Sequence, residues 1–398
     1  MPQRDSPWFQ LAVICLYSFS ATLAAQSLPP ISSLIIEDLG LSHAQMGLFI
    51  SIFSVPAILL AIPLSLLSLR LGPKKLGMAS ISLMITGSVI ILLVRDFPLL
   101  LMGRLVLGIG TAAMQIISLQ GVASWFRHHR MGVAMSIYST STLLAFFVAL
   151  VSFGAAGVAW GWRSSILISL VALFLSMIFF ARGFRLPAGS NIPGGDVVRL
   201  ELRSIFRMGA WIWVMGVVWA CCSGAINAAV AFLPDYIYSS GQTLAVAGMI
   251  TSIILAIHVI LGPFIGLLLD KVRYKHVMLI AGIAGTAIAA FFLASYIQYV
   301  IVWAIFIGIF ATIFMPAMSS IVPSLVPYAM LGLAYGITTM VGSIGSFAGP
   351  YLAGMVRDIT GGYQYSYWFV TLVFAVGLVL ITILFIRQLK LDRAQRGK

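Results

Sequence analysis

The sequence predicts an all-α membrane protein with twelve transmembrane helices in two pseudo-symmetric six-helix bundles. Three observations lead to this fold class. Of the 398 residues, 61 % are hydrophobic and only 8 % are charged, whereas a soluble domain carries about 25 % charged residues. The apolar residues form long runs near the ~20 residues that cross a bilayer as a helix. Finally, the two halves of the chain repeat several short motifs in the same order.

The apolar runs define the expected helices one by one. Residues 183–207 form the longest polar interruption, and their Pro and Gly residues break helical continuity. We therefore expect an N-terminal bundle over 1–182, a cytoplasmic linker over 183–207 and a C-terminal bundle over 208–398, with a short surface helix within the linker. The expected spans are 8–31, 44–67, 76–94, 98–124, 131–158, 164–182, 208–236, 243–268, 277–295, 298–322, 331–356 and 366–386.

The repeated motifs lie about 200 residues apart in the two halves. Internal repeats of this kind predict a substrate site near the bilayer midplane between the halves, with alternating access by rocking one bundle on the other. The matching pairs are Leu28-Pro29 with Leu233-Pro234, Ser65–Lys75 with Gly266–His276, Gly108-Ile109 with Gly308-Ile309, and Gly132 with Gly332.

The net charge of +13 would suggest nucleic-acid binding in a soluble protein. Here the basic residues gather in the short connections on one side of the predicted membrane, so they report topology and no nucleic-acid partner is expected. The exceptions are Arg95, Arg163, Arg357 and Arg104. The bias predicts a multi-pass protein of the cell membrane, a bacterial inner membrane, with both termini in the cytoplasm.

Arg104 lies in the fourth span, where loops cannot account for its charge. A charged side chain at membrane depth costs about 2.5–3.5 kcal/mol on insertion scales, so it is usually functional. The alternative is an arginine near the end of the span whose guanidinium reaches the interface along its aliphatic stem. Both interpretations stay open at this point.

The loop and fourth-span motifs resemble those of the major facilitator superfamily. That family has a Gly-x-x-x-Asp-Arg/Lys-x-Gly-x-Arg/Lys-Arg/Lys loop after the second span, a weaker copy after the eighth, and Arg-x-x-x-Gly-x-Gly in the fourth. Ser65–Lys75 is the first copy but has Leu69 in place of the Asp, whereas Gly266–His276 keeps Asp270. The resemblance implies a cytoplasmic latch, for which the gating candidates are Asp270, Lys271, Arg273 and Arg70. The alternative is that these residues belong to an ordinary cytoplasmic loop.

The resemblance also implies that spans one, four, seven and ten line the central cavity, assisted by two, five, eight and eleven. Polar residues at helical spacing in these spans are the substrate-binding candidates, together with one histidine in span eight. For each hydroxyl, the alternative is a bond to its own backbone or to a neighbouring helix. The candidates are Arg104, Gln115, Ser18, Thr22, Gln26, Ser223, Asn227, Trp219, His258 and Tyr335.

The ionisable groups bear on the substrate class. None of the ten acidic residues falls in mid-span, whereas a carrier of cations needs a buried counter-charge. His258 can act as an anion contact or proton relay, or be a neutral histidine bonded to a neighbouring helix. The interior therefore favours an anionic or neutral substrate.

These observations predict a secondary transporter of a small anionic solute, an organic carboxylate, with protons as a possible second partner. One alternative is an exporter of neutral lipophilic drugs or metabolites, and another is a non-transporting membrane receptor on the same fold. We find no metal-ligand cluster, phosphate loop or nucleophile–base pair, so no enzyme activity, metal or cofactor is expected. The chain is expected to be a monomer in the lipid bilayer.

Overall fold

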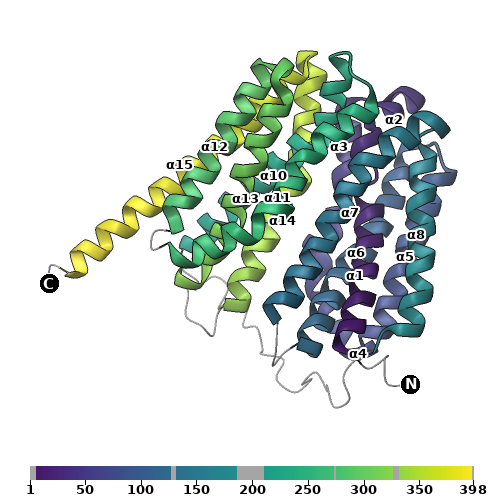
Figure 1. The fold of residues 1–398 in the computed structure, drawn as a ribbon, viewed down its shortest axis with the longest axis horizontal. Coiled ribbons are helices and arrows are strands. Elements are labelled where there is room, and N and C mark those ends of the chain that lie inside the picture. The colour runs from purple at the N-terminus through teal and green to yellow at the C-terminus, as the bar shows by residue number, and fades with distance from the viewer. Residues whose placement is uncertain (1–5, 127–130, 186–209, 273–274, 326–330, 397–398) are drawn as a thin grey trace. The chain divides into compact units, whose positions relative to one another are not determined.

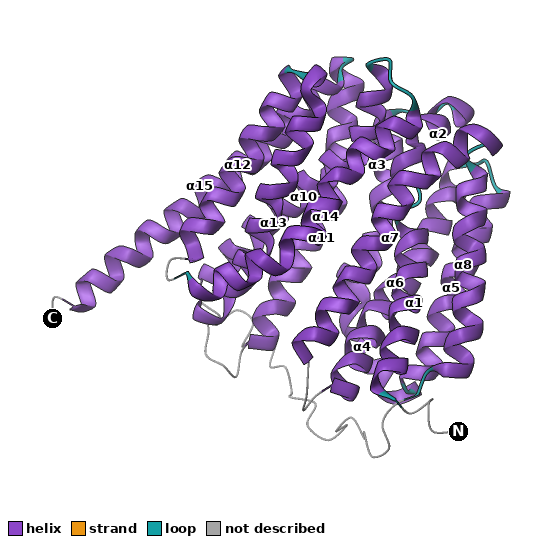
Figure 2. Cartoon of the chain, in the orientation of Figure 1, coloured by secondary structure: helices purple, strands orange, loops and turns teal. Residues whose placement is uncertain are grey.

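The computed structural model describes residues 6–126, 131–185, 210–272, 275–325 and 331–396. Within these residues the chain is helical throughout, and Figure 2 shows helices joined by short loops with no strand in the described part. Eleven helices among the described residues are long and apolar enough to cross a membrane. The all-α membrane fold class that the sequence predicts is therefore confirmed.

The chain divides by its internal contacts into two compact units, which are described separately. The first unit comprises Met1–Leu41, Ile52–Arg199 and Thr243–Met249, and the second comprises Ser42–Ser51, Leu200–Gln242 and Ile250–Lys398. The larger part of the linker expected over 183–207 lies outside the described residues, as does the surface helix expected within it.

The first unit contains most of the N-terminal helices shown in purple to blue in Figure 1. From the third predicted span onward, the helices of this unit begin and end within a few residues of the predicted spans. They are α1 (Pro7–Ala25), η2 (Pro29–Ile31), α2 (Ser32–Leu39), η3 (Ile52–Ser54), α4 (Val55–Leu71), α5 (Pro73–Leu93), α6 (Phe97–Phe126), α7 (Met131–Trp160) and α8 (Arg163–Gly183).

The first two predicted spans were wrong in one respect, because neither is a continuous helix. The span expected over 8–31 stops at Ala25 and resumes as η2 and α2. Pro29 and Pro30 have no N–H to donate to the carbonyls four residues earlier, which favours a break in the α-helix at this point. The span expected over 44–67 is interrupted at η3, ahead of Pro56, for the same reason.

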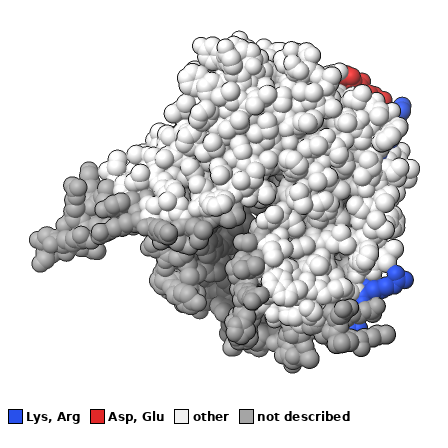
Figure 3. Space-filling view, in the orientation of Figure 1, with Lys and Arg blue, Asp and Glu red and all other residues white. Residues whose placement is uncertain are grey.

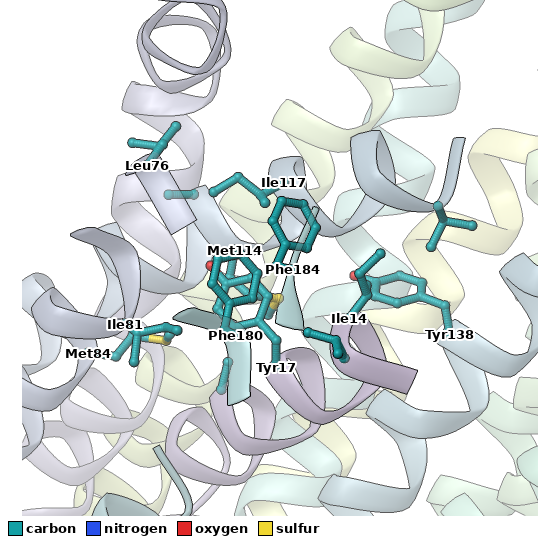
Figure 4. Close-up of a cluster of buried hydrophobic side chains, with 14 of the residues drawn as sticks. Ile14, Tyr17, Leu76, Ile81, Met84, Met114, Ile117, Tyr138, Phe180 and Phe184 are labelled. Atoms are coloured by element: carbon teal, nitrogen blue, oxygen red, sulfur yellow. The ribbon is translucent and has the colours of Figure 1, made fainter. Parts of the chain in front are cut away.

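The core of the first unit is a cluster of apolar side chains in which α1 meets α5, α6, α7 and α8 (Figure 4). The Phe180 ring is fully buried, with its centroid 4.4 Å from that of Phe184 and 4.7 Å from that of Tyr17. The Tyr17 hydroxyl shares a hydrogen bond with Ser80. A buried tyrosine hydroxyl needs such a partner, so this contact orients α1 against α5.

The second unit contains the green to yellow helices of Figure 1, with one short helix from early in the chain. That helix is α3 (His43–Ser51). The others are α10 (Ala210–Ser239), α11 (Leu244–Lys271), α12 (Lys275–Ser295), η4 (Ile297–Tyr299), α13 (Val300–Leu325), α14 (Leu331–Thr360) and α15 (Tyr363–Arg396). Residues of α11 up to Met249 group with the first unit. The last span was expected to end at 386, but α15 continues to Arg396.

The surface of the described helices suits a lipid environment. Large apolar side chains such as Leu59, Phe179 and Val379 are exposed. On the face shown in Figure 3, described charged side chains appear only near helix ends, and the surface between them is uncharged. In water such a surface would drive association, whereas lipid tails match it. The chain is a multi-span membrane protein.

Candidate functional site

Arg104 lies in α6 and is fully buried, with 0 % of the side chain exposed. It is among the largest fully buried side chains of the described residues. The guanidinium therefore reaches neither the lipid-facing nor the water-facing surface of the first unit. This observation does not fit an arginine whose charge extends to the membrane interface.

One side of the guanidinium is at the end of α1. Its Nη2 donates a hydrogen bond of 3.0 Å to the carbonyl oxygen of Ala25, the last residue of that helix. In a continuous helix this carbonyl would accept from the N–H of residue 29, but Pro29 has none. Arg104 therefore supplies, in a charge-assisted bond, the donor that the backbone at Pro29 lacks.

The other side of the guanidinium is at the break in the second span. The Arg104 guanidinium carbon lies 4.9 Å from the centre of the Phe53 ring, a cation–π distance. Phe53 belongs to η3, and Gly108 lies so close to its carbonyl that a methyl group at 108 would overlap it. Two proline-interrupted spans thus converge on one buried positive charge.

The other candidates of α1 and α6 have different environments. The Ser18 hydroxyl lies 3.1 Å from the Cys15 carbonyl and 3.2 Å from the Ser141 hydroxyl, so it joins α1 to α7. Thr22 and Gln26 are half-buried in the last turn and C-cap of α1, beside Ala25 in the chain. Gln115 is exposed and three turns from Arg104 along α6, roughly 16 Å at 1.5 Å per residue, so the structure does not bring the two together.

In the second unit, two polar candidates of α10 contact α14. The Ser223 hydroxyl donates to the Gly342 carbonyl at 2.7 Å. The Asn227 amide donates to the Ser223 carbonyl at 2.8 Å and to the Ser346 hydroxyl at 3.2 Å. These bonds join two helices, which is the alternative to substrate binding that the sequence leaves open for such polar residues.

Trp219, one turn earlier in α10, is half-buried and lines a small hollow between α10 and α13. The other lining residues are Cys222, Ser223, Phe314 and Met318. The wall is almost entirely apolar, with the Ser223 hydroxyl as its polar group.

The two remaining binding candidates lie in α11 and α14. His258 is half-buried, and its ring makes no hydrogen bond to another residue that the structure describes. Tyr335 falls within α14, but its side chain lies outside the described part of the structure. Both roles therefore remain predictions.

The gating candidates are described only in part. Arg70 is exposed in the last turn of α4, where a cation suits the negative end of the helix. Asp270 and Lys271 fall in the last turn of α11 with side chains outside the described part, and Arg273 lies outside it altogether. The cytoplasmic latch remains a prediction.

The structure also gives specific environments to two acidic residues that the sequence reasoning passed over. Asp235 is only 1 % exposed, because α10 continues past it to Ser239; an expected helix end at 236 had placed this carboxylate at a surface. Asp358, treated only as a loop residue, accepts hydrogen bonds from the N-terminus of α3. The Ser42-x-x-Gln45 pattern was a visible signal for that helix start.

Membrane-spanning helices with a buried charge at two helix breaks are typical of membrane transport proteins. The family model described as Major Facilitator Superfamily matches residues 14–244 and 220–398. The chain belongs to this superfamily of secondary transporters, and it is not an enzyme.

Individual relatives are distant but match along most of the chain. The nitrite extrusion protein of Bacillus subtilis is 25 % identical over 88 % of this chain and 88 % of its own. The probable nitrate transporter NarT of Staphylococcus haemolyticus is 22 % identical over 89 % of this chain and 90 % of its own. Among solved structures, a bacterial homologue of the human lysosomal transporter Spinster has a TM-score of 0.79 at 16 % identity, covering 94 % of this chain and 95 % of its own. The last similarity shows the fold alone.

Proposed function

We propose that this chain moves a small anionic solute, an organic carboxylate, across the membrane by alternating access. The observation that carries the proposal is the fully buried guanidinium of Arg104 at the breaks of two spans. Transporters built from repeats bind solutes near the bilayer midplane, where interrupted helices expose backbone groups to the ligand. The two breaks and the charge supply such a place in the first unit.

The chemistry of a guanidinium favours an anion with two oxygens in one plane. Arginine carries five N–H donors in a rigid fork. A carboxylate or a nitrate can accept two parallel bonds from such a fork. The names of two relatives describe nitrite and nitrate as their solutes, which supports an anionic substrate here. Because Arg104 is fully buried, the anion reaches it when the first unit opens at the helix breaks.

The Trp219 indole, the Phe314 ring and the Met318 thioether line the small hollow between α10 and α13 of the second unit. The hollow has room for about one water molecule, so it carries no argument for an organic over an inorganic anion. The organic carboxylate is our proposal for the solute, and the panel of the transport test decides it against the inorganic oxyanions.

The transport test uses purified protein in proteoliposomes with a panel of radiolabelled carboxylates, inorganic oxyanions and neutral lipophilic compounds. We expect counterflow of at least one carboxylate, and inhibition by carboxylates before nitrate. Counterflow of neutral compounds alone would contradict the anion proposal and support the exporter. Saturable binding without flux of any compound would support the receptor.

We also propose that protons move with the anion, carried by His258 or by the substrate acid. An imidazole changes its charge near neutral pH. His258→Gln keeps a polar side chain but cannot take up a proton, so we expect uptake to lose most of its increase between about pH 8 and pH 6. The measurement is initial uptake against pH for wild type and variant. An unchanged profile would show that His258 is not the carrier.

Three further features remain part of the proposal. The arginine and lysine bias supports cytoplasmic termini. We retain a monomer as the working unit, with the N-terminal bundle 1–182 and the C-terminal bundle 208–398 as its halves. Labelling of a single cysteine at each terminus, from either side of the membrane, tests the orientation.

A further inference from the structure

The short helix α3 begins with two different sets of capping contacts. Its own residues supply a capping box: the Gln45 N–H donates to the Ser42 hydroxyl at 3.1 Å, and the Ser42 N–H donates to the Gln45 side-chain oxygen at 2.9 Å. The backbone N–H groups of His43 and Ala44 remain. A distant carboxylate accepts from both.

That carboxylate is Asp358, near the end of α14. One of its oxygens accepts from the His43 N–H at 2.8 Å, and the other accepts from the Ala44 N–H at 2.7 Å. The His43 Nδ1 lies 2.9 Å from the first oxygen. A negative group at a helix N-terminus meets both the free N–H donors and the positive end of the helix dipole.

Aromatic and cationic groups surround this contact within the second unit. The rings of His43 and Tyr363 meet edge to face with centroids 5.4 Å apart. The Arg357 guanidinium carbon lies 4.8 Å from the centre of the Tyr363 ring. Gly354 allows α14 to approach so closely that a methyl group at 354 would overlap the His43 carbonyl. The Asp358 carboxylate, the Tyr363 ring and the close approach at Gly354 thus hold the start of α3 against α14 and the first residue of α15.

The second predicted span, 44–67, is divided between the two units a few residues after the start of α3. Ser42–Ser51 groups with the second unit, and the chain from Ile52 onward groups with the first. The change coincides with η3, where the helix is interrupted ahead of Pro56. A helix interruption of this kind is a place where backbone angles can change without breaking a regular helix.

We propose that Asp358 and His43 form a gating clasp, which holds α3 on α14 in one state of the transport cycle and releases it in the other, with η3 as the hinge. The inference rests on alternating access, which is part of the proposed function. It assigns gating to residues that differ from Asp270, Lys271, Arg273 and Arg70, which belong to the expected cytoplasmic latch. Asp358 lies near the end of α14, and His43 lies at the start of α3. The charge bias predicts that these helix ends are on the non-cytoplasmic side of the membrane, opposite the expected cytoplasmic latch.

The test measures hydrogen–deuterium exchange of the full chain in lipid nanodiscs, without substrate. Asp358→Asn removes the charge but keeps the shape. If the proposal is correct, amides of residues 43–51 and of the facing α14 segment 347–358 should exchange at least about 10-fold faster in Asp358→Asn than in wild type, because a bond to a charged group is lost. Asp96→Asn, another exposed carboxylate directly before a helix, is the matched control and should change neither segment.

A second variant separates a clasp from a simple helix cap. Ser42→Asp combined with Asp358→Asn gives α3 a carboxylate of its own, so its first turn stays capped without α14. The clasp predicts protected amides at 43–46 but continued fast exchange at 347–358. Wild-type exchange in both segments of this double variant, or in Asp358→Asn itself, would overturn the proposal.

Transport kinetics add a second measurement, because a purely structural role of Asp358 would not change the maximal transport rate while leaving the substrate Kd unchanged. With a substrate found by counterflow, Asp358→Asn should change the maximal rate at least fivefold while the substrate Kd stays within twofold. If wild type moves no anion, the proposed function fails, whereas the exchange experiment still decides whether the clasp exists.

Discussion

Arg104→Gln is expected to lower the affinity for the transported anion by about 10- to 100-fold, because a hydrogen bond to a charged group contributes about 1.5–3 kcal/mol. Glutamine keeps an N–H donor on a shorter side chain but has no charge. Arg104→Lys keeps the charge and loses the planar fork, so we expect a smaller loss. Substrate Kd and counterflow rate in proteoliposomes measure both effects. Arg182→Gln, which removes an exposed charge from the last turn of α8, is the control.

The contact with Ala25 makes a second variant necessary, because Arg104 also stabilises the end of α1. Pro29→Ala restores an N–H that can donate to the Ala25 carbonyl within the helix. In the double variant with Arg104→Gln, we expect thermal stability to recover while anion affinity stays low. Recovery of transport as well would show that the arginine acts only on the helix end and would contradict its role as anion ligand.

Gly345→Ala is expected to destabilise the second unit strongly. Gly345 lies in α14 against α10, where an added methyl group would overlap the backbone of Ala220. The two helices cannot move apart without weakening the bonds from Ser223 and Asn227. Overpacking of this kind costs about 1–3 kcal/mol, and backbone atoms yield less than side chains do. The measurement is the thermal midpoint of purified protein in detergent.

Gly262→Ala is the matched control for that substitution. Gly262 also lies in a membrane-spanning helix, α11, but an added methyl group would meet no atom within 4 Å. Alanine favours a helix over glycine by about 1 kcal/mol, so this variant should be neutral or slightly stabilising. Equal midpoints for the two alanine variants would contradict the close packing of α10 on α14.

The positions of the spans could be predicted from the sequence because the membrane imposes a local rule. A helix must satisfy its own backbone and be apolar over about 20 residues, and both properties are visible in a short window. The interruptions at Ala25 and Ile52–Ser54 were missed although Pro29, Pro30 and Pro56 were visible. Prolines in membrane helices are often tolerated when a neighbour satisfies the freed groups, so sequence alone does not say whether a proline ends a helix.

Burial of Arg104 at membrane depth was one of the two interpretations that the sequence left open, and its neighbours were not predicted. Ala25 is 79 residues away in the chain, and Phe53 belongs to a turn that was expected to be helix. Ser18 and Ser223 show the converse case. Their spacing placed each on a helix face, yet only the fold showed that Ser18 meets Ser141 and that Ser223 bonds the Gly342 carbonyl.

The sequence by itself determined the membrane environment, the helical class and the superfamily, because composition, apolar run length and short motifs depend on neighbouring residues. The tertiary structure alone decided which polar groups meet: Arg104 with Ala25, and Asp358 with the start of α3. The physical reason is that a hydrogen bond requires two groups within about 3 Å, and residues 79 or 315 positions apart are brought together only by packing of whole helices.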